Sequence, residues 1–136
     1  MPKGLPVLIA LAVLAIGCRE PQSREYFIRS DRSGEYNFEL SLTDSLSSYD
    51  VSFYTAIDKP LFRRDTLVSF PMQVVWRSPS GRYFSETVYY PVAEMRFRYR
   101  RGLVPSEYGT WSISVTLPEE PPRLRGLGII CAKAKY

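Results

Sequence analysis

Hydrophobic and polar residues alternate along most of the chain after residue 35, with a period close to two. In residues 36–42, for example, every second residue is aromatic or aliphatic, and the residues between them are polar. Because successive side chains of a strand point to opposite faces, this pattern places one face on a core and the other in water. Nothing in the chain has the period of a long amphipathic helix. The pattern therefore predicts an all-β protein.

The alternation predicts a stripe of residues on one face of each strand. A short aromatic patch at residues 26–28 precedes these stripes and predicts either a first strand or a docking segment. The stripes are Tyr36, Phe38, Leu40 and Leu42; Tyr49, Val51, Phe53, Thr55 and Ile57; Phe70, Met72, Val74 and Trp76; Phe84, Glu86, Val88 and Tyr90; Met95, Phe97 and Tyr99; Trp111, Ile113, Val115 and Leu117; and Leu127, Ile129 and Cys131.

Turn-forming residues separate the stripes. Residues 78–81, Ser-Pro-Ser-Gly, suit a tight turn, because proline is preset for its second position and Gly81 tolerates positive φ. Residues 44–48 and the proline-rich residues 118–122 mark two further connections. Seven or eight short strands at this spacing predict an antiparallel β-sandwich, immunoglobulin-like or jelly-roll-like. A small open barrel is the alternative.

The amino terminus has the pattern of a targeting segment. Residues 4–17 carry no charge, follow Lys3 and end at Cys18, after which the sequence turns polar at once. The apolar run is shorter than the roughly 20 residues of a membrane-spanning helix, and its layout is typical of a secretory signal. We therefore divide the chain into a signal peptide at 1–17, a tether or first strand at 18–33, and a sandwich domain at 34–136.

The signal ends in Ala-Ile-Gly-Cys at residues 15–18, which resembles a bacterial lipobox, so we expect Cys18 to be acylated and to become the new amino terminus. More than one acyl chain would retain the domain at a membrane. Arg19 stands where the usual inner-membrane retention signal has Asp, which favours the outer membrane, facing the periplasm. An apolar anchor with an incidental cysteine is the alternative. With Cys18 acylated, Cys131 is the remaining thiol, so no intrachain disulfide is expected.

The composition excludes several classes of catalytic and metal-binding site. The 136 residues include no histidine and two cysteines, which excludes Ser-His-Asp and Cys-His catalysis and a zinc site of the HExxH type. Pairs of carboxylates among Glu86, Glu94 and Glu107 have no spacing that singles them out for glycoside hydrolysis. We expect a protein that is not an enzyme, with no cofactor and no metal. The net charge of +4 is mild, and nucleic acid is not an expected partner of an exported chain.

The most charged stretch is residues 95–101, where Arg96, Arg98 and Arg100 alternate with apolar residues. On a strand these three would project from one face, where their guanidinium groups could bind phosphate or carboxylate of an acidic partner. The alternative is that they protect an edge strand from pairing with another chain.

Ten tyrosines and two tryptophans suggest a platform on which sugar rings could stack. We expect Tyr54, Tyr89 and Tyr90 to face outward and to form such a glycan site. Tyrosine is also a good strand former, so the alternative is that most of these rings lie in the core.

A series of short motifs follows in order along the chain: Cys18, residues 38–46 and 49–51, residues 70–72 and 76–81, residues 86–89, Tyr99-Arg100, residues 109–113 and residues 124–130. In these motifs and their order the chain resembles the gliding-motility-associated lipoprotein H family of Bacteroidota. This resemblance implies an outer-membrane lipoprotein that acts as a non-catalytic assembly or structural partner of the gliding machinery and its type IX secretion system, or of a related envelope complex. It supplies no catalytic residues. A binding module for envelope glycan is the alternative function.

Overall fold

The computed structural model describes residues 23–58 and 69–135, and these residues form eight strands. The predicted all-β sandwich is confirmed, and the aromatic patch at 26–28 lies in the first strand. The strands are β1 (Ser23–Arg29), β2 (Glu35–Leu42), β3 (Ser47–Ile57), β4 (Ser69–Arg77), β5 (Tyr83–Pro91), β6 (Arg96–Leu103), β7 (Gly109–Thr116) and β8 (Leu124–Lys135).

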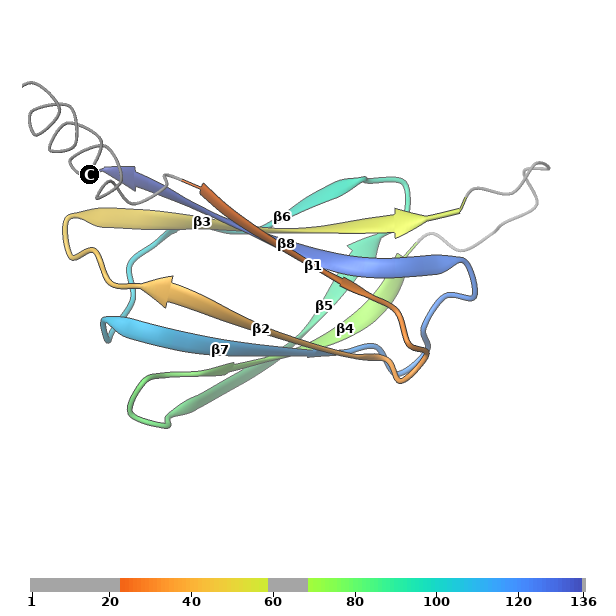
Figure 1. Cartoon of the computed structure of the whole chain (residues 1–136), viewed down its shortest axis with the longest axis horizontal. Coiled ribbons are helices and arrows are strands. Elements are labelled where there is room, and N and C mark those ends of the chain that lie inside the picture. The colour runs from red at the N-terminus through yellow and green to blue at the C-terminus, as the bar shows by residue number, and fades with distance from the viewer. Residues whose placement is uncertain (1–22, 59–68, 136) are drawn as a thin grey trace, which may run out of the picture.

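The strands pair as one long hairpin that has been rolled up. β4 pairs with β5, β3 with β6, β2 with β7 and β1 with β8, all antiparallel. Further pairing of β3 with β8 and of β4 with β7 gives two four-stranded sheets, a first sheet in the order β1-β8-β3-β6 and a second in the order β2-β7-β4-β5. This nested order is that of a jelly roll. Figure 1 shows the two sheets as an upper and a lower layer.

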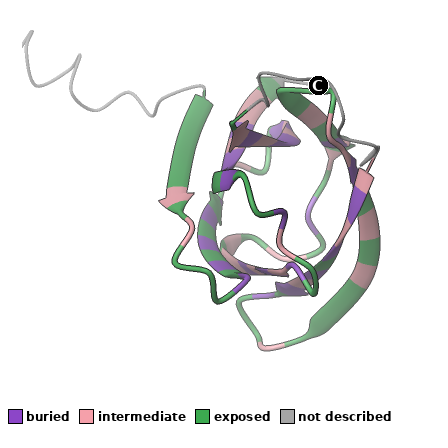
Figure 2. Cartoon of the chain, turned by 90° about the vertical axis from the view of Figure 1, so that its right-hand side faces the viewer, coloured by how far each residue is buried: buried purple, intermediate pink, exposed green. Residues whose placement is uncertain are grey.

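The core lies between the two inner faces, and the predicted alternation places it correctly in most strands. β2 shows this most clearly, because its residues are exposed and buried in strict turn. Figure 2 shows buried and exposed positions alternating along the strands that surround the interior. Met95 is an exception, because β6 begins one residue later and the Met95 side chain is 76% exposed. Cys131 is buried, and this burial raises the pKa of its thiol to about 11.

The connections divide between two ends of the sandwich. At the end that we call proximal lie the start of β1, the end of β8, and the connections β2–β3, β4–β5 and β6–β7. In Figure 1 this end is on the left, where the C terminus is marked. The connections β1–β2, β5–β6 and β7–β8 lie at the opposite, distal end, together with the end of β3 and the start of β4. In the β4–β5 turn Gly81 has a φ of 93°, as its sequence context predicts.

The predicted signal peptide and the lipidation site Cys18 lie outside the described residues. Among the described residues, no helix has the length and apolar character needed to cross a membrane.

Candidate functional site

The arginine row predicted on β6 does not form, because Arg100 leaves it. Arg98 lies opposite Ser52 of β3, but Arg100 lies opposite Val51, so β6 has one residue more than β3 at this point. Such a β-bulge interrupts the alternation of side chains between the two faces. Arg100 consequently forms an ion pair with Glu86 of the second sheet, whereas Arg98 stays exposed. The prediction was wrong because it assumed unbroken alternation.

The predicted tyrosine platform does not form either. Tyr90 is fully buried, its ring stacks on Phe70, and its hydroxyl donates to the carbonyl oxygen of Glu94 at 2.8 Å. Its outward placement was wrong, because adjacent residues of a strand face opposite sides and Tyr89 is 64% exposed. Tyr89 lies on the outer face of the second sheet, remote from the first sheet to which Tyr54 belongs.

The structure does bring Tyr54 together with two of the predicted arginines, on the outer face of the first sheet. Tyr54 lies directly opposite Arg96, with Arg98 two residues along β6. The Tyr54 ring lies over Gly128, where an added Cβ would be 2.1 Å from the ring, and it stacks on Phe27 with centroids 5.8 Å apart. Because Phe27 already stacks on this ring, Tyr54 serves mainly to cover the sheet.

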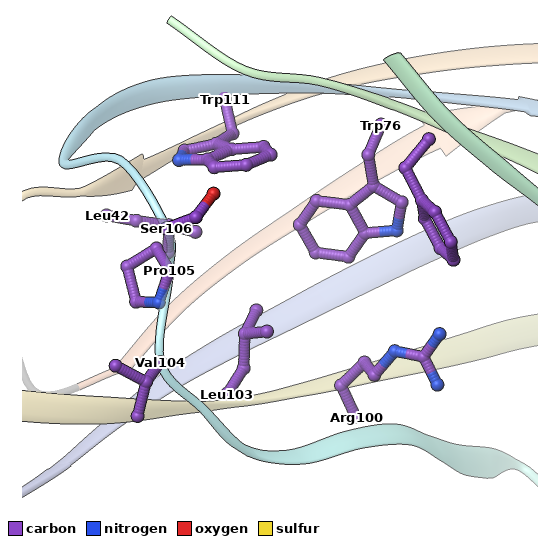
Figure 3. A pocket seen from close by; sticks show the side chains of 9 residues that line it. Leu42, Trp76, Arg100, Leu103, Val104, Pro105, Ser106 and Trp111 are labelled. Atoms are coloured by element: carbon purple, nitrogen blue, oxygen red, sulfur yellow. The ribbon is translucent and has the colours of Figure 1, made fainter. Parts of the chain in front are cut away.

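A larger feature lies between the sheets at the proximal end, beside their edge strands β5 and β6. We call this cavity of about 360 Å³ the apolar cleft. Figure 3 shows the Trp76 and Trp111 rings of the second sheet facing Leu103 and Arg100 of β6. The two indoles meet edge to face, with centroids 6.0 Å apart. The cleft is lined by Leu42, Trp76, Phe84, Arg100, Leu103, Val104, Pro105, Ser106 and Trp111.

A polar network fixes one wall of the apolar cleft. The Trp76 Nε1–H donates to the Tyr99 hydroxyl at 2.9 Å, and that hydroxyl donates in turn to the Glu86 carboxylate. Arg100 binds the same carboxylate oxygen and lies over the Tyr99 ring, 4.6 Å from its centroid. Burial, assisted by the bond to Glu86, raises the pKa of Tyr99 well above its usual value. The network thus joins the edges of both sheets and orients the Trp76 ring.

The apolar cleft can accept an apolar group with a polar end. Its aromatic walls supply contact area at little entropic cost, and Phe84 keeps 53% of its side chain exposed at the opening. The Trp111 Nε1–H is already bonded to the Glu107 carbonyl at 2.9 Å, so its ring is held in place. Arg100, 38% exposed, offers a charged contact at the rim.

A second hollow, of about 510 Å³, lies on the outer face of the second sheet, and most of the residues that line it have polar side chains. One residue from each strand crosses the sheet in register here: Glu39, Ser112, Arg77 and Tyr83. The Arg77 guanidinium lies 5.5 Å from the centroid of the Tyr83 ring, which is 68% exposed. We call the hollow that contains this row the polar hollow. It combines an exposed ring with hydroxyl, carboxylate and guanidinium groups.

Sequence reasoning missed Phe84, Trp76 and Trp111 as site residues, because an inward-facing aromatic stripe normally indicates core. Glu86 was the available signal. It is a carboxylate within the stripe formed by Phe84, Val88 and Tyr90, and a charge on an inward face is rarely placed there without a partner. An aromatic stripe interrupted by a charge therefore indicates the edge of a site.

Comparison with known proteins gives no match: no family model, no curated protein and no solved structure is significantly similar to this chain. Within residues 23–58 and 69–135, no group of three or more Asp, Glu or Cys side chains is placed to hold a metal ion.

Proposed function

We propose that this chain is a lipid-anchored, non-catalytic envelope protein that serves as an assembly partner in the gliding-motility and type IX secretion machinery or in a related envelope complex. The motifs around Cys18 support the anchor, and the family resemblance supports the setting. The observation that carries the binding role is the apolar cleft, whose aromatic walls open beside Phe84 at the surface. A cleft of this size fits one large apolar side chain, the kind of anchor residue that dominates protein interfaces.

The position of Cys18 adds a constraint on orientation. Four residues separate Cys18 from Ser23, where β1 starts, so the five steps from one Cα to the other span at most about 18 Å. The proximal end therefore lies toward the membrane, and the apolar cleft lies at this end. Its partner is then a protein held at the same membrane, where confinement raises the effective concentration.

Fractionation tests the anchor. Replacing Cys18 by Ser removes the acylated thiol, and we expect the variant to carry no acyl chain and to be lost from the outer-membrane fraction. The parent protein, analysed in parallel by mass spectrometry, should carry acyl chains on a mature chain that begins at Cys18. An unmodified full-length parent would contradict the proposal.

A matched pair of variants on β5 tests the cleft. We expect Phe84→Ala to abolish co-purification of an envelope component that cross-links to the acylated parent. Tyr89→Ala removes a ring of similar exposure on the opposite face of the same strand and should have no effect. Equal retention of the component by both variants would show that the cleft does not bind it.

The polar hollow supports envelope glycan as the second candidate ligand. Its exposed Tyr83 ring and flanking polar groups match the chemistry of a saccharide, which presents both an apolar face and hydroxyls. Soluble peptidoglycan fragments should then bind saturably, and Tyr83→Ala should abolish binding while Tyr89→Ala should not. Binding that survives Tyr83→Ala would dismiss this site.

A further inference from the structure

The outer strand of the second sheet, β5, leaves one of its two sides unpaired. It pairs with β4 over nine residues without a shift of register, and among residues 23–58 and 69–135 no strand pairs with its other side. We call this unpaired side of β5 the open edge. A regular unpaired edge offers backbone donors and acceptors to another strand, so proteins commonly protect such edges with charged side chains.

β5 lacks the protection that the other edge strands have. Exposed charged side chains occur on all three of those strands: Glu25 and Arg29 on β1, Glu35 and Glu39 on β2, and Arg96 and Arg98 on β6. The exposed side chains of β5 are uncharged, namely Tyr83, Phe84, Ser85, Thr87 and Tyr89. Its one charged residue, Glu86, is paired with Arg100. Among the described edges, that of β5 is therefore the one suited to accept a further strand.

The hydrogen bonds of the β4–β5 turn show which backbone groups face the open edge. The Ser78 N–H donates to the Arg82 carbonyl at 2.8 Å, one step beyond the last pair of the ladder. Hydrogen-bonded pairs alternate along an antiparallel ladder, so the even-numbered residues of β5 bond to β4. The odd-numbered residues, among them Ser85, Thr87 and Tyr89, turn their N–H and C=O groups toward the open edge.

The surroundings of the open edge indicate what kind of strand fits it. β6 lies over β5 in the first sheet, where the Phe97 ring meets the Tyr90 ring edge to face with centroids 5.7 Å apart. The β5–β6 connection carries one exposed carboxylate, Glu94. Against it stand three exposed arginines of β6 that form no ion pair with a described residue: Arg96, Arg98 and Arg101.

These charges argue against a second copy of the chain as the added strand. Two copies joined through β5 would also bring their β6 strands together, and the arginines of one copy would repel those of the other. A segment with acidic side chains would instead pair with them. The apolar cleft opens at the same edge, because Phe84 of β5 lines it, so such a segment also needs one large apolar side chain.

We propose that an extended acidic segment of a partner protein adds to the second sheet as a strand paired with the open edge of β5. Its backbone bonds to Ser85, Thr87 and Tyr89, its acidic side chains face the β6 arginines, and its apolar side chain enters the apolar cleft. Main-chain bonds give such strand addition its affinity, and alternate side chains give it specificity. This inference rests on the proposed function, because the segment is the part of the assembly partner that carries the anchor residue.

Amide exchange of the purified acylated protein in nonionic detergent, followed by NMR, is the test. The probes are two short capped peptides with threonine at every second position and one tryptophan, which carry either glutamate or lysine at the remaining positions. At saturation the glutamate peptide should slow exchange at Ser85, Thr87 and Tyr89 by about tenfold, the value of one backbone hydrogen bond. Glu86 and Val88, whose amides already bond to β4, should change little. The lysine peptide should bind about tenfold more weakly, because like charges meet at β6.

Thr87→Pro tests the open edge, and Thr87→Val is its matched control. Proline removes an N–H that points away from β4, so the sheet keeps its own bonds while the glutamate peptide should bind about tenfold more weakly. Valine keeps the N–H and is a good strand former, so this variant should bind as the parent does. Urea unfolding checks that the proline variant is folded, and the exchange pattern of the parent decides the question without it.

No saturable binding of the glutamate peptide, or binding that leaves exchange at Ser85, Thr87 and Tyr89 unchanged, would overturn strand addition. Protection of these amides that grows with protein concentration alone would overturn it in favour of a second copy. The proposed function fails separately. If the cross-linked envelope component is lost from Phe84→Ala but kept by Thr87→Pro, strand addition is wrong and the apolar cleft still binds. If it is lost from Thr87→Pro alone, the open edge binds without the cleft.

Discussion

The distal and proximal ends of the sandwich each hold a polar cluster around a glutamate, and the two clusters differ in how far they are buried. Each end has a glutamate between the sheets that accepts a hydrogen bond from a tyrosine and pairs with an arginine. At the distal end Glu120 is bound by Tyr36 and Ser30, and its side chain is 8% exposed. At the proximal end Glu86 is bound by Tyr99 and is 25% exposed, beside the apolar cleft.

The difference lies in what each glutamate joins. Glu120 belongs to the β7–β8 connection and ties it to the β1–β2 connection, where Arg32 also binds the carbonyls of Pro121 and Pro122. This cluster closes the distal end of the sandwich. Glu86 instead lies on an edge strand and joins it to β6 at the border of a cavity. The same kinds of side chain can thus close one end of a fold or shape a binding cleft at the other, depending on how much water reaches them.

Removing each glutamate should reduce the free energy of unfolding, and the reduction should be larger for Glu120 than for Glu86. Glu120→Ala leaves the partly buried hydroxyls of Ser30 and Tyr36 without their acceptor and should reduce the free energy of unfolding by about 3 kcal/mol. Glu86 is 25% exposed, so water can replace its carboxylate as the acceptor for Tyr99, and Glu86→Ala should cost about 1 kcal/mol. Urea unfolding of both variants measures this difference. Equal losses would mean that the two clusters stabilise the fold alike.

Alkaline pH should reduce the stability that Tyr36 contributes, because it ionises the tyrosine hydroxyl. Burial, with Glu120 as a lesser cause, raises the pKa of Tyr36 from 10.0 to about 12. Because the folded pKa is raised, the stabilisation is present below pH 10 and is lost as the pH rises through about 12, by about 2 kcal/mol. Tyr36→Phe cannot ionise, so the gap between parent and variant stability should narrow between pH 9 and pH 11.5.

Urea unfolding at these two values checks the prediction, and Tyr99→Phe provides the proximal counterpart, because burial raises the pKa of Tyr99 in the same direction. Tyr89→Phe, which alters an exposed ring, is the control. A parent and a Tyr36→Phe variant whose stabilities fall in parallel over this range would contradict the role given to Tyr36.

The two arginines Arg98 and Arg100 of β6 should differ slightly in how much they contribute to stability. Arg98 is exposed, so Arg98→Gln should change the free energy of unfolding by no more than about 0.5 kcal/mol. Arg100→Gln removes the ion pair with Glu86 and the contact with the Tyr99 ring, and should cost about 1 kcal/mol. Thermal unfolding of both purified variants makes the comparison, and two equal shifts would mean that the bulge has no energetic consequence.

The candidate sites were harder to predict than the strands, for a reason that single residues show. The alternation around Tyr90 already placed it with Val88 and opposite to Tyr89, so its burial could have been read from the sequence. Arg100 could not be predicted in this way, because the extra residue in β6 is defined only by pairing with β3. The meeting of Arg29 and Arg125 in one pocket lining at the distal end was missed for the same kind of reason, since these residues are 96 positions apart in the chain.

Alternation and turn residues alone determined that the chain forms short strands with one apolar face, because period-two patterning acts within each strand. Only the tertiary structure decided which strands are neighbours, where β6 bulges, and which polar groups meet at each end. These outcomes depend on contacts between segments that are distant in the sequence. The energies of such contacts cannot be derived from the local pattern of residues. The jelly-roll order thus turned dispersed arginines and an interrupted aromatic stripe into two separate pockets.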